Sequence, residues 1–287
     1  FVGLAVPAGR INALLEPSPW LFLIFIVGVF AFVGNPFGLD GRLQIEGFIS
    51  SNVLGFLAVL NMAIILNRPK LYLFDYATFV AITIVMLLCL SRSAMLGALA
   101  LVWVRIGWGR GTLIFGSIAG AMAIVFAGNK IIRRMLILED VMTNGGSGRG
   151  ELWRFLVGNW FDTPANWLFG FGPGGVHRHP HWLTTEDAAH SMIIGGFYYW
   201  GIAGFLFVMG LFAFAVREIS RAPVSAERNM ARDVLLIMLA NGAVDESYNG
   251  SQVNAISAIF FGLVLAVIAE TRRQRRAEIR GPMVSAL

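Results

Sequence analysis

The chain has 287 residues, of which 57% are hydrophobic and only 14% are charged. Its mean hydropathy is +0.70, whereas a water-soluble domain of this size carries about 25% charged residues. A soluble fold must cover its outside with polar groups, so the composition excludes a single water-soluble core and indicates a membrane protein. The net charge of +5 is weak evidence for nucleic-acid binding, because basic residues gather in cytoplasmic loops during membrane insertion.

The first residue and the single cysteine set two further limits on the protein. The chain begins at Phe1 rather than at Met, which is typical of a fragment or a processed form, and the stretch before Pro7 could be the tail of a further span. The single cysteine, Cys89, excludes an intrachain disulfide and a multi-cysteine metal site.

Eight apolar segments follow one another along the chain, separated by clusters of Arg, Pro, Gly or Asn. They lie near residues 20–34, 47–66, 71–90, 93–106, 112–128, 191–216, 233–247 and 253–269. Several are shorter than the roughly 20 residues that a helical span needs, so their boundaries are approximate. The sequence predicts an all-α, polytopic transmembrane helical bundle with about eight spans.

The segments divide the chain into four parts. We expect a first transmembrane bundle of about five spans in residues 1–128 and a second of about three spans in residues 191–270. Between them, residues 129–190 form one long extracytoplasmic loop domain with short helices. Residues 271–287 form a basic cytoplasmic tail.

The distribution of basic residues predicts the orientation. If the tail is cytoplasmic, alternation makes residues 1–19, 67–70, 105–111 and 217–232 cytoplasmic too, and these five pieces hold 14 of the 22 basic residues. Of the other eight, six lie in the long loop, which the positive-inside rule largely exempts. The asymmetry favours both ends inside and the long loop outside.

Three polar features are expected to meet at the outer face. The first is Ser91-Arg92-Ser93 between the third and fourth spans, and the second is Ser147-Gly148-Arg149 followed by Trp153. The third runs from Gly170 to Gly175 and through a histidine-rich stretch to His190 at the start of the sixth span.

These pieces resemble the bacterial O-antigen ligase and O-antigen polymerase family between about residues 45 and 215. The matching residues are Gly47-Phe-Ile-Ser-Ser-Asn52, Ser91-Arg92, Ser147-Gly148-Arg149 with Trp153, Gly170-Phe-Gly172, His190 and Trp200-Gly-Ile-Ala-Gly204. Ser191 departs from the family pattern, which usually has Asn after the histidine. Family members also commonly have more spans than eight, in keeping with a missing N-terminal portion.

The resemblance implies transfer of a glycan from an undecaprenyl-diphosphate carrier to an acceptor sugar, without a metal or another cofactor. Arg92 and Arg149 are assigned to the diphosphate, because an arginine is always protonated and binds phosphate bidentately. His190 is assigned as the general base that deprotonates the acceptor hydroxyl. Attack opposite the diphosphate would invert the anomeric centre.

Each assignment has a plainer alternative. Arg92 could anchor a helix end in the headgroups, Arg149 could be a solvated charge in a glycine-rich loop, and His190 could be an interfacial histidine. Arg154 and Arg178 are further phosphate contacts in this interpretation, although solvated surface is the commoner role of such residues. Trp153 joins them as a substrate-binding candidate.

Gly170 and Gly172 could cradle phosphate with backbone N–H groups, but glycine with proline more often marks a tight turn. Asp245 and Glu246 could pair with an active-site arginine or cap a helix end.

The tryptophans at 160, 167 and 182 suit sugar stacking and interfacial anchoring equally well. His177, His179 and His181 could suggest zinc, yet no fourth ligand is evident and Pro180 interrupts a regular strand, so we expect no metal site.

The sequence therefore predicts a membrane glycosyltransferase in the bacterial inner membrane with its active site facing the periplasm. Its partners would be the undecaprenyl-diphosphate-linked glycan, the bilayer, and an acceptor glycan or the lipid A core; polymerase, ligase and protein glycosylation all stay open. The alternatives are a transporter or flippase of lipid-linked sugars, which would favour ionisable residues near mid-bilayer, and a non-catalytic envelope-assembly subunit. A hydrolase is disfavoured because no G-x-S-x-G motif is present.

Overall fold

All regular structure in the described part of the chain is helical. The computed structural model describes residues 7–33, 36–37, 43–44, 49–106, 149–172, 191–244, 259 and 261–274. Strands are absent from these residues, which contain one isolated antiparallel bridge between Phe37 and Leu43. The expected all-α class is confirmed for these residues.

The helices follow the apolar segments closely. They are α2 (Ala8–Leu15), α3 (Ser18–Phe32), α4 (Ser51–Leu66), α5 (Leu73–Leu88), α6 (Arg92–Ile106), α10 (Arg149–Trp160), α11 (Pro164–Phe169), α12 (Met192–Ser220) and α13 (Ala226–Val244), and residues 261–274 are helical as well. Seven of the eight predicted segments overlap these helices, whereas the segment 112–128 lies outside the described residues.

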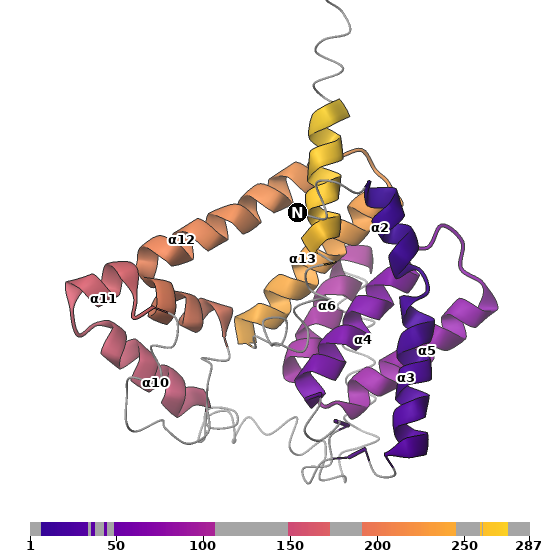
Figure 1. The fold of residues 1–287 in the computed structure, drawn as a ribbon, viewed down its shortest axis with the longest axis horizontal. Helices are drawn as coiled ribbons and strands as arrows, with labels where there is room; N and C mark the ends of the chain where they lie inside the picture. Colours follow the sequence, from indigo (N-terminus) through magenta and orange to yellow (C-terminus); the bar gives the residue numbers. More distant parts are fainter. Residues whose placement is uncertain are drawn as a thin grey trace, which may run out of the picture.

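Helix α4 is the centre of the larger group of helices (Figure 1), with α3, α5, α6 and α13 packed around it. Its sequence is apolar on every side, as in a helix without a solvent-facing stripe, and most of its side chains are buried, including Phe56 and Leu60 at 0% exposure. The buried residues of α4 join those of α6, α13 and residues 263–268 in one core. Packing against α4 thus fixes the position of α6, the helix that begins with Arg92.

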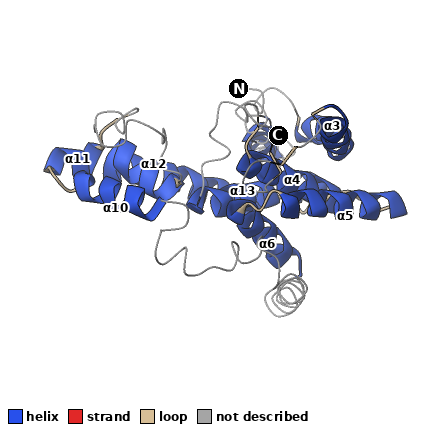
Figure 2. Cartoon of the chain, turned by 90° about the horizontal axis from the view of Figure 1, so that it is seen from below, coloured by secondary structure: helices blue, strands red, loops and turns tan. Residues whose placement is uncertain are grey.

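The smaller group consists of α10, α11 and the first part of α12, which lie together on the opposite side of the molecule from α3 and α5 (Figure 2). Leu156 and Trp160 of α10 pack on Tyr198 of α12 in a second buried cluster. The Trp160 indole N–H donates to the Asn166 carbonyl at 3.0 Å. One of the three tryptophans considered for sugar stacking is therefore used in packing.

Two stretches are long and apolar enough to cross a membrane: Ala8–Phe32, formed by α2 and α3, and Met192–Ser220. Only 28% and 11% of their most apolar windows are buried, whereas the core helix of a soluble protein is mostly covered. Helices α4 and α5 are apolar but shorter. Residues 8–15 were expected in a cytoplasmic piece, and they form α2 because Ala8, Ile11 and Leu15 face the core.

We call the end of the larger group where α4 and α6 begin the outer end, and the opposite end the inner end. The inner end contains α2 and the last described helix, which lie together at the top of Figure 1. The Ala8 backbone N–H donates to Glu270 Oε1 at 2.8 Å. This is the end at which the sequence places both termini.

A buried ionic network also joins three helices at the inner end. Asp233 is 0% exposed and accepts from Arg105 at 2.5 Å, from Arg232 at 2.9 Å and from the Asn67 amide at 2.9 Å. Asn67 ends α4, Arg105 lies in the last turn of α6, and Asp233 lies near the start of α13. A buried carboxylate needs such partners, because an unpaired charge in the interior is very costly.

Candidate functional site at the outer end of the bundle

Three helices that open towards the outer end begin with a serine cap. Ser50 accepts from the Val53 N–H at 3.4 Å, Ser91 from Ala94 at 3.3 Å, and Ser191 from Ile194 at 3.4 Å. A serine hydroxyl at this position satisfies one of the four N–H groups that a helix start leaves without partners. The helix dipoles of α4, α6 and α12 therefore place partial positive charge at their beginnings, which favours anions there.

Arg92 is the first residue of α6 and is half-buried. The flanking Ser91 and Ser93 are 1% and 2% exposed, and their hydroxyls lie 2.9 Å apart. Gly55 of α4 allows this close approach, because a Cβ there would lie 2.8 Å from Ala94 Cβ. The start of α6 is thus held against α4, and the position of the Arg92 backbone is fixed.

Leu90 makes the sharp connection between α5 and α6. Its φ of +50° lies in the left-handed region, which is uncommon for a residue other than glycine. The Leu43 N–H donates to the Leu88 carbonyl at 2.9 Å, so the end of α5 is satisfied from a distant part of the chain. This strained turn lets α6 begin at Arg92, four residues after Leu88, the last residue of α5.

Arg149 opens α10, and Trp153 follows one turn later. The side chains of both residues lie outside the described part of the structure, as do His190, Arg178, Asp245 and Glu246 and the histidines at 177, 179 and 181. Arg154, also on α10, is exposed. The assigned roles of these residues remain predictions, although α10 and α12 both begin on the side facing the larger group (Figures 1 and 2).

Gly170-Phe171-Gly172 docks against a break in α12. Helix α12 is interrupted at Gly201, whose φ of +63° and ψ of −172° are not helical. The carbonyls of Tyr198 and Tyr199, which precede the break, accept from the N–H groups of Phe171 and Gly172, each at 2.8 Å. The predicted sixth span is therefore a helix in two arms rather than one continuous helix. The break is possible because the adjacent turn supplies hydrogen-bond donors to the carbonyls that lose their partners within the helix.

The N–H groups of this turn are already used in the fold. Gly170 donates to Asn166 at 2.8 Å, and the next two N–H groups donate to α12. Gly170 and Gly172 have φ of +70° and +78°, which a glycine adopts without the steric cost of a Cβ. The arrangement agrees with the turn interpretation, and contact between these glycines and a substrate remains a prediction.

The start of α12 is tied to the end of α13. The Ser191 hydroxyl donates to the Ala243 carbonyl at 3.0 Å, and Ser191 is 1% exposed. His190 directly precedes this serine, whereas Asp245 directly follows the last described residue of α13, Val244. The hydrogen bond therefore joins Ser191 to the end of α13, while His190 and Asp245 themselves lie outside the described residues.

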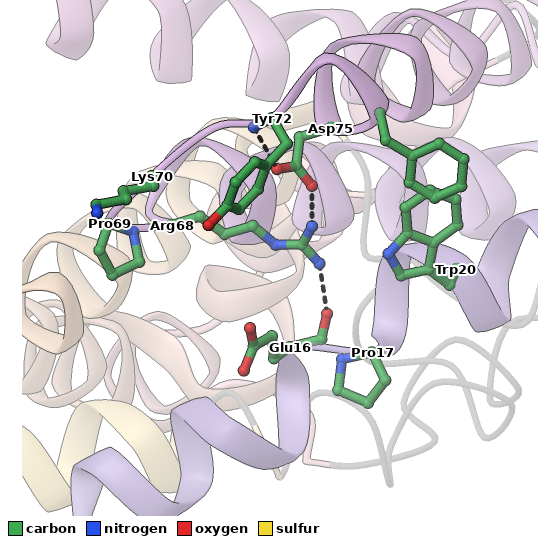
Figure 3. A pocket seen from close by; sticks show the side chains of 9 residues that line it. Glu16, Pro17, Trp20, Arg68, Pro69, Lys70, Tyr72 and Asp75 are labelled. Atoms are coloured by element: carbon green, nitrogen blue, oxygen red, sulfur yellow. Dashed lines mark hydrogen bonds and ion pairs between the residues drawn. The ribbon is translucent and has the colours of Figure 1, made fainter.

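One pocket in the described part of the chain lies at the inner end (Figure 3). It measures about 850 Å³ and lies between the start of α3 and the connection from α4 to α5. Arg68 forms an ion pair with Asp75 and donates to the Glu16 carbonyl at 2.7 Å, while Trp20 stacks on Phe74 with centroids 3.7 Å apart. Its nine described lining residues include none of the residues predicted for catalysis, and Arg68 is used to join the connection after α4 to α5 and to the end of α2.

Two features were not predicted from the sequence. One is the contact between the Gly170–Gly172 turn and Gly201. The sequence contains a sign of it in the motif Trp200-Gly-Ile-Ala-Gly204, but it does not reveal which segment packs against that motif. The other is Asn241, a fully buried amide in α13. The feature of the sequence that could have drawn attention to it is its position as a polar residue within an apolar segment. Among the described residues, no group of three or more His, Cys, Asp or Glu could hold a metal ion.

Comparison with known proteins assigns no family to the chain. No protein-family model matches it, and no curated protein matches it at a significant level. The functional argument therefore depends on the residues and their positions.

Proposed function

We propose that this chain is an integral-membrane glycosyltransferase that moves a glycan from an undecaprenyl-diphosphate carrier to an acceptor sugar. In this proposal it is a multi-pass protein of the bacterial inner membrane with about eight spans, and its active site faces the periplasm beneath the loop domain at residues 129–190. The exposed apolar faces of Ala8–Phe32 and Met192–Ser220 support insertion in a bilayer.

The observation that carries the proposal is the position of Arg92. A guanidinium at the first turn of α6 adds a full positive charge to the partial charge of the helix start. The flanking serines are buried and bonded to each other, so the cation is attached to a rigid support. A cation on such a support would stabilise the negative charge that develops on the leaving group during the reaction.

The assigned residues then divide the chemistry between them. His190 accepts the proton of the acceptor hydroxyl as its oxygen attacks the anomeric carbon. The bond between that carbon and the diphosphate oxygen breaks, and undecaprenyl diphosphate departs with the electron pair. Arg92 and Arg149 bind the two phosphates as this charge develops, and attack from the opposite face inverts the anomeric centre.

The test uses purified protein, a polyprenyl-diphosphate-linked glycan and candidate acceptors, with a chelator in the buffer. We expect transfer with inverted linkage, and a large loss of rate in Arg92→Gln, Arg149→Gln and His190→Ala variants that remain folded. Arg221→Gln is the control, because Arg221 lies at the inner end, 3.9 Å from Glu218 and 44% exposed, and its replacement should leave the rate unchanged.

The same assay separates the alternatives. Normal transfer in all three site variants would overturn the assignment, and lipid movement across vesicles without transfer would indicate a flippase instead. The acceptor that is used decides between polymerase, ligase and protein glycosylation.

A further inference from the structure

Asn241 is a buried amide with two unpartnered atoms. The residue is 0% exposed, and neither its amide nitrogen nor its carbonyl oxygen has a hydrogen-bond partner among the described residues. Buried polar side chains are nearly always paired, since an unpaired one loses its hydrogen bonds to water without replacement. Such a group in a folded protein requires a reason.

Asn61 shows how the same residue type is normally accommodated in this core. It lies within α4, is 5% exposed, accepts from the Ser18 hydroxyl at 2.8 Å and donates to the Leu57 carbonyl at 2.8 Å. The two asparagines therefore occupy similar apolar surroundings and differ in whether the fold itself satisfies them.

The spacing along α13 places Asn241 towards the outer end of α6. Residues 233, 237 and 241 are four apart and so share one face of the helix. Asp233 contacts Arg105 in the last turn of α6, and Ile237 lies against Gly97, where a Cβ would be 3.4 Å from Ile237 Cγ2. The two helices run antiparallel, so Asn241, one turn beyond Ile237, lies level with the first turn of α6, where Arg92 is located.

We propose that Asn241 binds the sugar that is attached directly to the diphosphate of the lipid-linked donor. This rests on the proposed function, because it places the diphosphate at the start of α6. Both amide atoms lack a partner within the described part of the chain, so a suitable ligand must offer a donor and an acceptor together. A sugar hydroxyl or an N-acetyl group offers both, whereas an ionised phosphate offers only acceptors.

The amide is covered in the structure, so the sugar reaches it only when the outer turn of α13 shifts. The hydrogen bond from Ser191 to the Ala243 carbonyl holds that turn against the start of α12. On binding, the contacts that cover the amide are replaced by hydrogen bonds to the ligand. The amide atoms that lack partners in the free protein then recognise the sugar in the complex.

The experiment measures binding, so its result does not depend on transfer. Purified protein in detergent is titrated with two probes, a polyprenyl diphosphate and the same lipid carrying one N-acetylhexosamine. We expect the wild type to bind the sugar-bearing probe about tenfold more tightly, the ratio that one good hydrogen-bonding group contributes. In Asn241→Leu this preference should disappear while affinity for the bare diphosphate is retained.

Thermal unfolding without ligand gives the second readout. Leucine has a similar volume and no polar atoms, so Asn241→Leu should raise the melting temperature, whereas the matched control Asn61→Leu should lower it by removing two hydrogen bonds. Asn241→Ala serves if the leucine variant does not fold, and it should lose the same sugar preference. A sugar preference that survives both replacements, or a lower melting temperature in Asn241→Leu, would overturn the inference. Absence of transfer by a wild type that shows the preference would refute the proposed function alone.

Discussion

Gly170 and Gly201 face each other where the end of α11 meets the break in α12. A Cβ on Gly170 would lie 2.6 Å from the Gly201 nitrogen, and one on Gly201 would lie 2.5 Å from the Phe169 nitrogen. Real Cβ atoms essentially never approach backbone atoms so closely. Two glycines that lie 31 positions apart in the sequence therefore create one contact between backbones.

Gly201→Ala should destabilise the protein. The residue has φ of +63° and ψ of −172°, a region that is essentially restricted to glycine and costs another residue about 1–3 kcal/mol. The new methyl group would also meet the α11 backbone. Thermal unfolding in detergent measures the loss. The matched control is Gly210→Ala in the second arm of α12, where a Cβ meets nothing within 4 Å; it should be neutral or stabilise by about 0.5–1 kcal/mol. Equal melting temperatures in both variants would contradict the docking described here.

The apolar pattern was sufficient to predict most helices, but not where α12 breaks. Gly195, Gly196, Gly201, Gly204 and Gly210 all lie within this helix, and composition does not indicate which of them interrupts it. The break occurs at Gly201 because Phe171 and Gly172 supply the two donors that the interrupted helix requires. That information comes from a distant segment and so is absent from any local pattern.

The candidate site shows the same limit. The sequence placed Arg92 at the junction between two apolar segments, and in the structure it is the first residue of α6. It could not separate Asn241 from Asn61, since both are single amides in apolar runs. Only the partners distinguish them, and those partners are set by how α3, α4 and α13 pack.

The predicted topology can be tested with single cysteines. The only native cysteine, Cys89, is 0% exposed, so it should contribute little background to labelling of the folded protein. Trp167 on α11 is 43% exposed, and Trp167→Cys should react with a membrane-impermeant maleimide in cells whose outer membrane is permeabilised. Lys70→Cys, in the exposed turn before α5, should react only after the inner membrane is opened. The reverse pattern would place the loop domain in the cytoplasm and refute the proposed function.

The Asp233 network should be a major contributor to stability. Replacing Arg105 with Met leaves a fully buried carboxylate with fewer partners, and breaking a buried pair costs about 3–5 kcal/mol. A double-mutant cycle with Asp233→Asn should show strong coupling between the two residues. The comparison pair is Arg221 and Glu218, which is 3.9 Å apart with a partly exposed arginine; its coupling should stay below about 1 kcal/mol. Similar coupling energies in both cycles would show that the buried Asp233 network contributes no more to stability than an exposed ion pair.

Ser191→Ala should reduce both stability and transfer, since this hydroxyl has two roles. It caps α12 through the Ile194 N–H and holds α13 through the Ala243 carbonyl, and it directly follows the proposed base, His190. Loss of a cap costs about 1 kcal/mol, and a less ordered helix start would misplace the imidazole. Ser191→Thr keeps the hydroxyl and should restore transfer.

Ser225→Ala is the matched control for this variant. Ser225 accepts from the Arg228 N–H at 3.1 Å at the start of α13, which is the inner end, so its loss should cost similar stability and leave transfer unchanged. Transfer rates and melting temperatures measured on all three variants decide the point. If the alanine at 191 lowers the melting temperature but transfers normally, the start of α12 does not position the base, and His190 must be replaced as the candidate.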